Sequence, residues 1–277
     1  MIDINLDICF TRDELHQEFF WYLDHQEGSR NLSCNKNKIV KQFQQDVFYR
    51  HEKELWKDDD IKARLIVNRC KYLNKTPEEL TTLDILRGFK ISGIWYGYSG
   101  FNPMVCKFFY NHLKENYGEE HIRCYDPCGG WGHRVLGSVD IDQYIYNDIN
   151  TEVCKNIQDM CDYFDMYDVV VYNKDAVGFI PDDDFNVMFT CPPYYNLEVY
   201  DNGPYASRDE YDRFIDGLFD VFHKKTRCKY FGMVIREDFI GAHTDYVEKI
   251  ELINHASQYL NDTQKHKYQE YLYIWKK

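Results

Sequence analysis

The amino-acid sequence predicts an α/β fold: a mainly parallel sheet with helices on both faces, preceded by a mainly helical segment. Three observations support this prediction. From residue 122 onwards, short apolar runs alternate with helical stretches at spacings typical of strands joined by crossover helices. Two turns, one rich in glycine and one with two prolines, directly follow such apolar runs. The first ninety residues instead carry mainly the periodicity of helices.

Helix-start signals divide the N-terminal segment. Thr11 is followed three residues later by Glu14, which is the pattern of a capping box. Thr76 precedes Pro77, and proline is favoured in the first turn of a helix. A glycine-rich stretch, residues 88–103, is predicted to be an irregular loop. The predicted helices of this segment span residues 11–23, 38–56, 61–72 and a stretch that begins at Thr76.

The rest of the chain supplies the sheet and its covering helices. Apolar and β-branched runs predict strands at residues 122–125, 144–146, 169–172, 185–189, 230–235, 249–253 and 271–275. Helices are predicted at residues 104–117, 152–164 and 209–223. We therefore expect two parts, a mainly helical segment at residues 1–90 and a sheet domain at residues 91–277.

Charge is unevenly distributed between these two parts. The 277 residues include 33 Lys+Arg and 46 Asp+Glu, a formal net charge of −13. Residues 1–90 hold 15 basic and 16 acidic residues, a net of −1, so residues 91–277 hold 18 and 30, a net of −12. Acid-free stretches with several basic residues span 28–45, 61–77 and 221–236. The total charge argues against a nucleic-acid partner, whereas these stretches favour a local electropositive surface.

Composition also bears on where the chain works. Hydrophobic residues make up 44% of the chain, which is enough for a sizeable core. No run of 18 apolar residues predicts a membrane span, and the N-terminus lacks a signal-peptide pattern. The ten cysteines lack paired spacing. We therefore expect reduced thiols, no metal site, no membrane attachment and an intracellular protein, and the richness in Asn, Lys and Tyr points to an AT-rich genome such as that of a phage.

A glycine-rich turn, Asp126-Pro127-Cys128-Gly129-Gly130-Trp131-Gly132, follows the first predicted strand. Glycine lets the backbone turn sharply and approach a ligand closely. Asp148 and Asp175 follow the next two predicted strands, where one carboxylate can accept ribose hydroxyls and the other can bind an adenine amino group. The turn matches neither the dinucleotide fingerprint nor a phosphate-binding loop. The pattern therefore indicates a nucleoside-containing cofactor without a pyrophosphate.

A second turn, Thr190-Cys191-Pro192-Pro193-Tyr194, follows the predicted strand 185–189. Two prolines stop strand pairing and fix a rigid turn. The carbonyl of Pro192 is then free to accept a hydrogen bond, and Tyr194 has a rigid mount suited to stacking on a flat ring. Because both turns follow parallel strands, we expect them to share one edge of the sheet.

Together, the two turns resemble those of the S-adenosylmethionine-dependent amino methyltransferases of DNA, most closely phage- and virus-type members with Gly-Trp-Gly and Cys-Pro-Pro-Tyr turns. The resemblance covers about residues 98–277. It implies a Rossmann-like seven-stranded sheet whose last strand, near residues 271–275, is antiparallel. It also implies S-adenosylmethionine as cofactor and DNA as partner, with a base flipped into the pocket. The segment Ser99-Gly100-Phe101-Asn102-Pro103 looks like the part of the family that closes over the methionine end of the cofactor.

The resemblance assigns roles residue by residue. Expected cofactor-binding residues are Phe101, Asn102, Pro103, Asp126, Pro127, Cys128, Gly129, Gly130, Gly132, Asp148 and Asp175. Expected catalytic residues are Thr190, Cys191, Pro192, Pro193 and Tyr194. In the family, an Asp, Asn or Ser side chain and the first proline's carbonyl accept the amino hydrogens, while the aromatic ring stacks on the flipped base. These roles fall here to Cys191, the carbonyl of Pro192 and the ring of Tyr194.

Cys191 departs from the family pattern, because a thiol is a weak hydrogen-bond acceptor. Thr190 or the backbone could orient the amino group instead. Alternatively, Cys191 attacks pyrimidine C6 and the chain is a C5-type methyltransferase, or the chain is a non-catalytic module that binds cofactor and DNA. An RNA base methyltransferase is a further alternative, since guanine-N2 enzymes on structured RNA use a similar Pro-Pro-Tyr turn.

Little of the chain is left for a separate target-reading domain within or after the sheet. The loop after the second turn, with Asn196, Glu198, Tyr200 and the turn Asn202-Gly203-Pro204, is interpreted either as a lid over the base or as ordinary surface. Target reading is therefore expected in residues 1–90, in the loop 197–207, or in another subunit, whether a second copy or a recognition partner.

Overall fold

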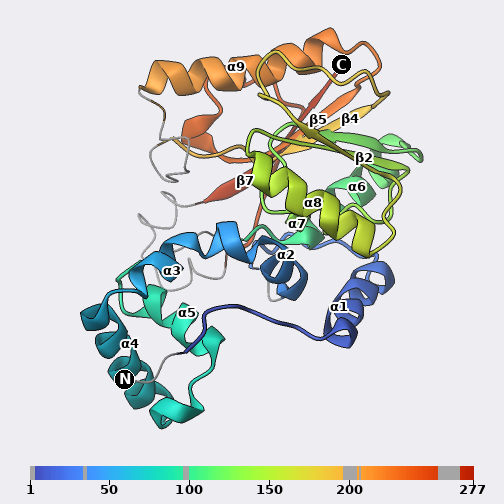
Figure 1. The fold of residues 1–277 in the computed structure, drawn as a ribbon. Helices are drawn as coiled ribbons and strands as arrows, with labels where there is room; N and C mark the ends of the chain where they lie inside the picture. Colours follow the sequence, from blue (N-terminus) through green and yellow to red (C-terminus); the bar gives the residue numbers. More distant parts are fainter. Residues whose placement is uncertain (1–3, 34–35, 96–99, 196–204, 206, 255–268) are drawn as a thin grey trace. The chain divides into compact units, whose positions relative to one another are not determined.

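The computed structural model describes residues 4–33, 36–95, 100–195, 205, 207–254 and 269–277. It contains a seven-stranded sheet in the order β3-β2-β1-β4-β5-β7-β6 (Figure 1). The strands are β1 (Arg123–Asp126), β2 (Gln143–Asp148), β3 (Val169–Asn173), β4 (Val187–Thr190), β5 (Tyr230–Arg236), β6 (Glu248–Glu251) and β7 (Glu270–Lys276). The predicted α/β fold is confirmed, and each predicted strand is present with ends that differ by at most two residues.

The strand order reverses at one point in the sheet, and one strand runs antiparallel to its neighbours. β1 pairs in parallel with both β2 and β4, and β4 pairs in parallel with β5. β7 runs antiparallel between β5 and β6, which confirms the antiparallel last strand that the resemblance implied. β1 and β4 are neighbours although β2 and β3 lie between them in sequence. The strand order therefore reverses between β1 and β4, where open α/β sheets bind ligands.

Helices cover both faces of the sheet. Phe219 of α9 contacts the ring of Phe231 at 5.1 Å between centroids. The neighbouring Gly232 faces the other way, since a Cβ there would lie 2.6 Å from the Phe109 ring of α6. Successive strand residues point to opposite faces, so α9 and α6 pack on opposite sides. The helices of the sheet unit that follow residue 100 are α6 (Pro103–Tyr117), α7 (His133–Leu136), α8 (Thr151–Tyr163) and α9 (Arg208–Lys224), with the short η2 (Glu237–Phe239).

The remaining helices are α1 (Arg12–Asp24), α2 (Lys38–Phe48), α3 (Arg50–Leu55), α4 (Asp59–Leu73) and α5 (Thr82–Ile91), with the short η1 (Pro77–Glu79). The predicted cap of α1 is confirmed: the Glu14 carboxylate accepts from the Thr11 backbone at 3.0 Å, and the Thr11 hydroxyl accepts from the Glu14 backbone at 3.3 Å. Three predictions were wrong. The helix expected to begin at Thr76 is only the short η1, and α5 begins at Thr82 after a separate cap at Thr81. The expected helix 38–56 breaks at Tyr49, whose φ of −112° is not helical.

The loop expected from residue 88 begins later, because Gly88 lies within α5. A side chain at Gly88 would collide with Arg69 of α4, since an added Cβ would lie 2.8 Å from the Arg69 Cδ. Gly88 therefore permits close packing of two helices instead of ending one.

The chain forms two compact units. One comprises residues 1–18 and 37–99, with a core that includes Tyr49, Trp56 and Leu65. The other comprises residues 19–36 and 100–277 and contains the sheet. Residues 19–36 thus fold with the sheet, while the assignment of residues 1–90 to DNA contact stays a prediction.

The cysteines in the described part of the chain are all free thiols. Among the described residues, no helix has the length and apolar character needed to cross a membrane.

Candidate active site

The two turns singled out in the sequence lie at one edge of the sheet. β1 ends at Asp126 and leads into the glycine turn, and β4 ends at Thr190 and leads into the proline turn. The two strands are hydrogen-bonded neighbours in parallel register, with Tyr125 opposite Met188. Both turns therefore flank the point where the strand order reverses.

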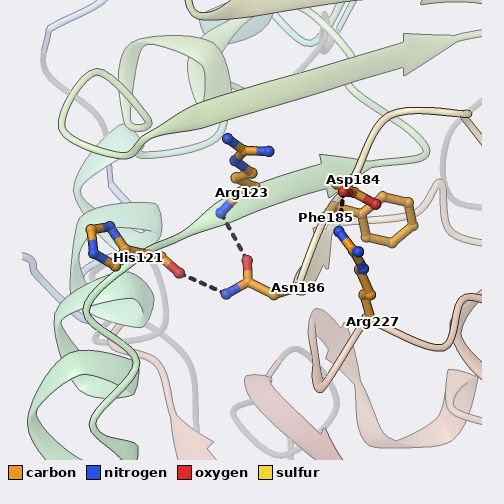
Figure 2. Close-up of a pocket in the computed structure, with 6 residues that line it drawn as sticks. All are labelled: His121, Arg123, Asp184, Phe185, Asn186 and Arg227. Atoms are coloured by element: carbon orange, nitrogen blue, oxygen red, sulfur yellow. Dashed lines mark hydrogen bonds and ion pairs between the residues drawn. The ribbon is translucent and has the colours of Figure 1, made fainter.

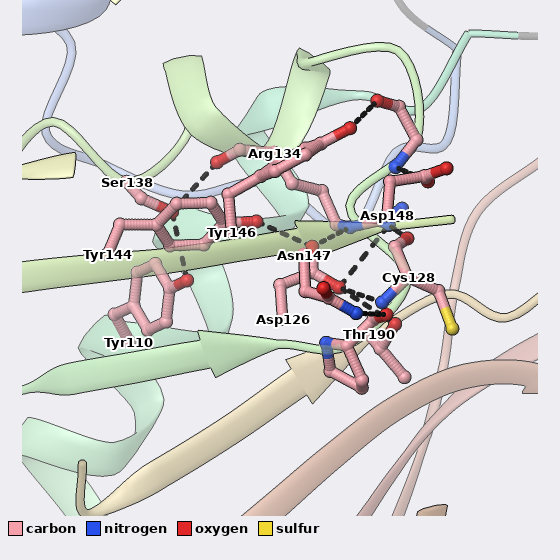
Figure 3. Close-up of polar contacts among 12 residues, drawn as sticks. Tyr110, Asp126, Cys128, Arg134, Ser138, Tyr144, Tyr146, Asn147, Asp148 and Thr190 are labelled. Carbon is pink, nitrogen blue, oxygen red and sulfur yellow. Dashed lines mark hydrogen bonds and ion pairs between the residues drawn. The ribbon is translucent and has the colours of Figure 1, made fainter. Parts of the chain in front are cut away.

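The fully buried Asp126 carboxylate ties the two turns together (Figure 3). Its Oδ2 accepts hydrogen bonds from Arg134 Nε at 2.6 Å and from the Tyr144 hydroxyl at 2.5 Å. Its Oδ1 accepts from the Thr190 hydroxyl at 2.8 Å and from the backbone N–H of Cys128 at 3.2 Å. Four protein donors thus occupy this carboxylate, so Asp126 holds the turns in shape and does not face the open edge.

Arg134 extends this network to the segment before α6. Its Nη2 donates to the carbonyl of Cys128, and its guanidinium lies 5.3 Å from the centre of the Phe101 ring. Arg134 is 5% exposed, so its charge is compensated inside the protein by Asp126. The contact brings Phe101 close to the glycine turn.

The glycine turn is packed too tightly for side chains. A Cβ at Gly129 would lie 2.0 Å from the Tyr146 ring, and Gly132 has a φ of +96°. The Gly129 N–H donates to the Asn147 carbonyl at 2.7 Å, and the Tyr146 hydroxyl donates to the Gly130 carbonyl at 2.6 Å. The residues of β2 therefore fix the backbone of the turn, as Figure 3 shows.

Asn147 and Asp148 position the end of β2 against the same turn. The buried Asn147 amide donates to the Pro127 carbonyl at 3.0 Å and to the Lys174 carbonyl at 3.1 Å, which joins the segments after β1 and β3. Each oxygen of Asp148 accepts one backbone N–H, from Gly130 and from Asn150, both at 2.9 Å. Burial raises the pKa of the half-buried Asp148.

The other expected cofactor residues differ in how their side chains are used. Asp175 is exposed, and its Oδ1 accepts the Val177 N–H at 2.9 Å. Burial raises the pKa of the Cys128 thiol well above its usual value, so the thiol is protonated. Pro103 is the first residue of α6, and an added Cβ at Gly137 would lie 2.3 Å from the Pro103 carbonyl oxygen.

The Asn102 side chain is engaged within the protein. Its Oδ1 caps α6 by accepting the Met104 N–H at 3.1 Å. Its Nδ2 donates to the carbonyls of Asn31 at 2.6 Å and Ser33 at 3.1 Å. Asn102 therefore anchors residues 31–33 beside α6, while its predicted neighbour Ser99 lies outside the described residues.

The aromatic ring of the proline turn, Tyr194, is held in place by contacts with two other residues. The Tyr194 ring stacks on Phe239 at 5.3 Å between centroids, with an interplanar angle of 26°, and its hydroxyl donates to Glu270 of β7. Pro192 is buried, whereas Cys191 and Pro193 are half-buried. The predicted loop residues Asn196, Glu198, Tyr200 and the turn 202–204 lie outside the described residues.

Sequence reasoning missed the residues that support these turns. Asn147, Tyr144 and Tyr146 belong to β2 and look like ordinary strand residues in the sequence. Phe239 and Glu270 come from η2 and β7, far from Tyr194 in sequence. A local pattern could not have identified them, because only the pairing of the strands brings them to the turns.

A surface cavity of about 170 Å³ lies at the opposite edge of the sheet (Figure 2). Asn186 spans it, accepting the Arg123 N–H at 2.8 Å and donating to the His121 carbonyl at 2.6 Å. Arg123 begins β1 and Asn186 precedes β4, so the cavity adjoins the amino ends of these strands. It is separate from the candidate active site.

No protein-family model matches the chain, and no curated protein matches it significantly. A Listeria monocytogenes protein assigned as a class I S-adenosylmethionine-dependent methyltransferase is similar in structure, with a TM-score of 0.46 and 13% identity over 96% of this chain and 88% of that one. YhhF of Escherichia coli, assigned as a methyltransferase, gives a TM-score of 0.42 and 12% identity over 62% of this chain and 86% of YhhF. TrmN of Thermus thermophilus gives a TM-score of 0.44 and 10% identity. The match covers 63% of this chain and 48% of TrmN, so the chain spans about half of TrmN. These likenesses concern the course of the backbone alone.

Proposed function

We propose that this chain transfers a methyl group from S-adenosylmethionine to an exocyclic amino group of a base in DNA, giving N6-methyladenine or N4-methylcytosine. One observation carries the proposal. A glycine turn and a Pro-Pro-Tyr turn flank the point where the strand order reverses, and both are joined to the buried Asp126. Ligands of open α/β sheets bind at such a point.

The glycine turn and Asp148 fit a nucleoside-containing cofactor. Each Asp148 oxygen accepts only one backbone N–H among the described contacts, and a carboxylate oxygen has two lone pairs, so each can still accept a ribose hydroxyl. The exposed Asp175, after β3, would reach the adenine amino group. Phe101 would cover the methionine end beside Arg134. When bound, S-adenosylmethionine supplies an electrophilic methyl group on a sulfonium centre.

The proline turn would hold the target base. The Tyr194 ring, fixed by Phe239 and Glu270, would stack on the flipped base. The Pro192 carbonyl would accept one amino hydrogen, which localises the nitrogen lone pair for attack. The Thr190 hydroxyl donates to Asp126 and keeps lone pairs that can accept, but Thr190 is fully buried, which does not favour it as the second acceptor.

A transfer assay tests the proposal directly. The purified chain would be incubated with labelled S-adenosylmethionine and either duplex DNA or tRNA, and the nucleosides would be identified by mass spectrometry. We expect N6-methyladenine or N4-methylcytosine in DNA and no methylation of tRNA. Methylation of tRNA alone, 5-methylcytosine in DNA, or cofactor binding without transfer would each contradict the proposal.

Tyr194→Ala is expected to lower kcat/KM for DNA methylation by about 5- to 150-fold, because stacking on one base contributes about 1–3 kcal/mol. Binding of S-adenosylmethionine, measured by calorimetry, should be unchanged. Tyr194→Phe keeps the ring and loses only the hydrogen bond to Glu270, so it should retain most activity. Tyr167→Ala, at a residue that is 85% exposed, serves as the matched control. Full activity in Tyr194→Ala would disprove the stacking role.

The α4 helix (Figure 1) is the proposed contact with the DNA backbone. Its acid-free stretch exposes Arg64 and Lys71, which lie nearly two turns apart along the helix. The exposed Asn68 lies between them on the same face. This face gives the chain a local positive surface despite its net charge of −13.

The double variant Arg64→Gln/Lys71→Gln is expected to weaken DNA binding and to reduce the slope of log K against log salt concentration by about 2. Fluorescence anisotropy with a labelled duplex at several salt concentrations measures both quantities. Lys155→Gln/Lys224→Gln removes the same charge from the sheet unit and should leave the slope unchanged. Equal slopes for the two double variants would show that α4 does not contact phosphates.

A further inference from the structure

Tyr211 of α9 carries a buried hydroxyl whose role within the protein is unexplained. The side chain is fully buried, and its hydroxyl has no hydrogen-bond partner among the residues that the structure describes. Leaving such a group unpaired costs about 1–3 kcal/mol. Most buried polar groups in native proteins are paired, so an unpaired hydroxyl is a candidate for contact with a ligand where its neighbours place it beside a site.

The Tyr211 ring lies against the proline turn. Its centroid is 6.0 Å from that of Tyr195, the residue that follows Tyr194, and 5.5 Å from that of Phe239. Phe239 is the same ring on which Tyr194 stacks. The Tyr205 ring closes another side at 5.2 Å. Tyr211 therefore belongs to the aromatic shell that supports the proposed base-stacking residue.

The electrostatic surroundings place the Tyr211 phenol near both turns. The thiols of Cys191 and Cys128 are among the groups whose charge would act on its pKa. Burial raises the pKa of Tyr211 far above its ordinary value, so the phenol keeps its proton and can donate it in a hydrogen bond. A neutral phenol can satisfy this proton only with an acceptor atom.

Adenine and cytosine carry such an acceptor next to the amino group. The ring nitrogen is N1 in adenine and N3 in cytosine, and each has a free lone pair. Guanine N1 and thymine N3 instead carry a hydrogen, so the phenol oxygen would have to accept there and its own proton would be left without an acceptor. Flipped bases are read through hydrogen bonds to this same edge, and a buried donor without its acceptor gives strong rejection.

We infer that the Tyr211 hydroxyl donates a hydrogen bond to the ring nitrogen beside the target amino group, and so selects adenine or cytosine over guanine and thymine. This inference rests on the proposed function. Donation to the ring nitrogen does not make the amino nitrogen more nucleophilic, so Tyr211 fixes the position of the base and its identity. That position would compensate for the weak acceptor Cys191 in the same turn.

The test combines a variant with a substrate analogue. Tyr211→Phe removes only an unpaired hydroxyl, so thermal stability should be unchanged or higher. The methylated base would be replaced in duplex DNA by its deaza analogue, 1-deazaadenine or 3-deazacytosine, which lacks the acceptor nitrogen. With the natural base, Tyr211→Phe should lower kcat/KM by about 10- to 100-fold. The unmodified protein should lose a similar factor on the analogue, and Tyr211→Phe should lose nothing further.

Tyr273→Phe provides the matched control. Tyr273 of β7 is also fully buried, and its hydroxyl likewise has no partner within the described part of the chain. This variant should keep full activity and full discrimination against the analogue. If Tyr211→Phe keeps activity or still discriminates against the analogue, the inference is wrong while the proposed function stands. If the unmodified protein transfers no methyl group to DNA, both fail.

Discussion

Asp126→Ala is expected to destabilise the protein by about 3–5 kcal/mol, because it leaves the Arg134 guanidinium buried without its counter-charge. The change also removes the acceptor of the Tyr144 and Thr190 hydroxyls. Urea unfolding followed by circular dichroism measures the loss. The double variant Asp126→Ala/Arg134→Met should recover part of it, since no unpaired charge then remains in the interior.

Asp220→Ala is the control for this prediction. Asp220 pairs with Lys224 on α9, but the two side chains are 68% and 64% exposed. An exposed pair of this kind contributes at most about 1 kcal/mol. If Asp126→Ala costs no more than Asp220→Ala, the buried network does not hold the two turns.

Glu52→Gln is expected to remove a pH dependence of about 3 kcal/mol from the stability of the helical unit. Glu52 of α3 is 4% exposed, and its Oε2 has no hydrogen-bond partner in the described chain. Burial raises the pKa of Glu52 from 4.5 to about 7. At about 1.36 kcal/mol per pH unit, that difference corresponds to about 3 kcal/mol.

The sign follows from proton linkage. The folded state binds the Glu52 proton more tightly than the unfolded state, so folding is favoured fully at low pH and loses stability as the pH rises from 4.5 through about 7. Glu52→Gln should therefore be more stable than the unmodified protein at pH 8 and similar at pH 4.5. Urea unfolding at both pH values measures this difference.

Glu54→Gln on the same helix provides the comparison, because the Glu54 side chain is 63% exposed beside Lys57. It should change stability little, and by similar amounts at both pH values. A Glu52→Gln variant whose stability differs from the unmodified protein by the same amount at pH 4.5 and pH 8 would contradict the prediction.

The sheet was predictable because strand signals are local. Most strands overlap an apolar or β-branched run, as in β3 (Val169–Asn173) and β5 (Tyr230–Arg236), whereas β6 (Glu248–Glu251) has a single apolar residue. Helix breaks were less accessible to prediction. Helical periodicity continues through Tyr49, where the chain in fact leaves the helix, and Gly88 resembles a break but serves close packing against Arg69.

The candidate site was predictable only in outline. The motifs identified the two turns and placed Asp126, Asp148 and Tyr194 at one edge of the sheet. They could not reveal that Asp126 is occupied by donors from β4, α7 and β2, because those contacts depend on strand pairing and helix packing. Tyr211 gave no signal either, since its position on α9 matches that of an ordinary core residue.

The path of the chain limits how this protein can have evolved. The polypeptide passes between the two units three times, after residues 18, 36 and 99, and α1 contributes residues to both. A deletion of residues 1–90 would strip Tyr22 from the sheet unit, where its carbonyl accepts a hydrogen bond from the buried Lys107 ammonium. Each unit is therefore built from two separate stretches of sequence and cannot be exchanged as one continuous segment. A single crossover after residue 99 would separate residues 19–36 from the rest of the sheet unit, so it would not exchange one whole unit for another.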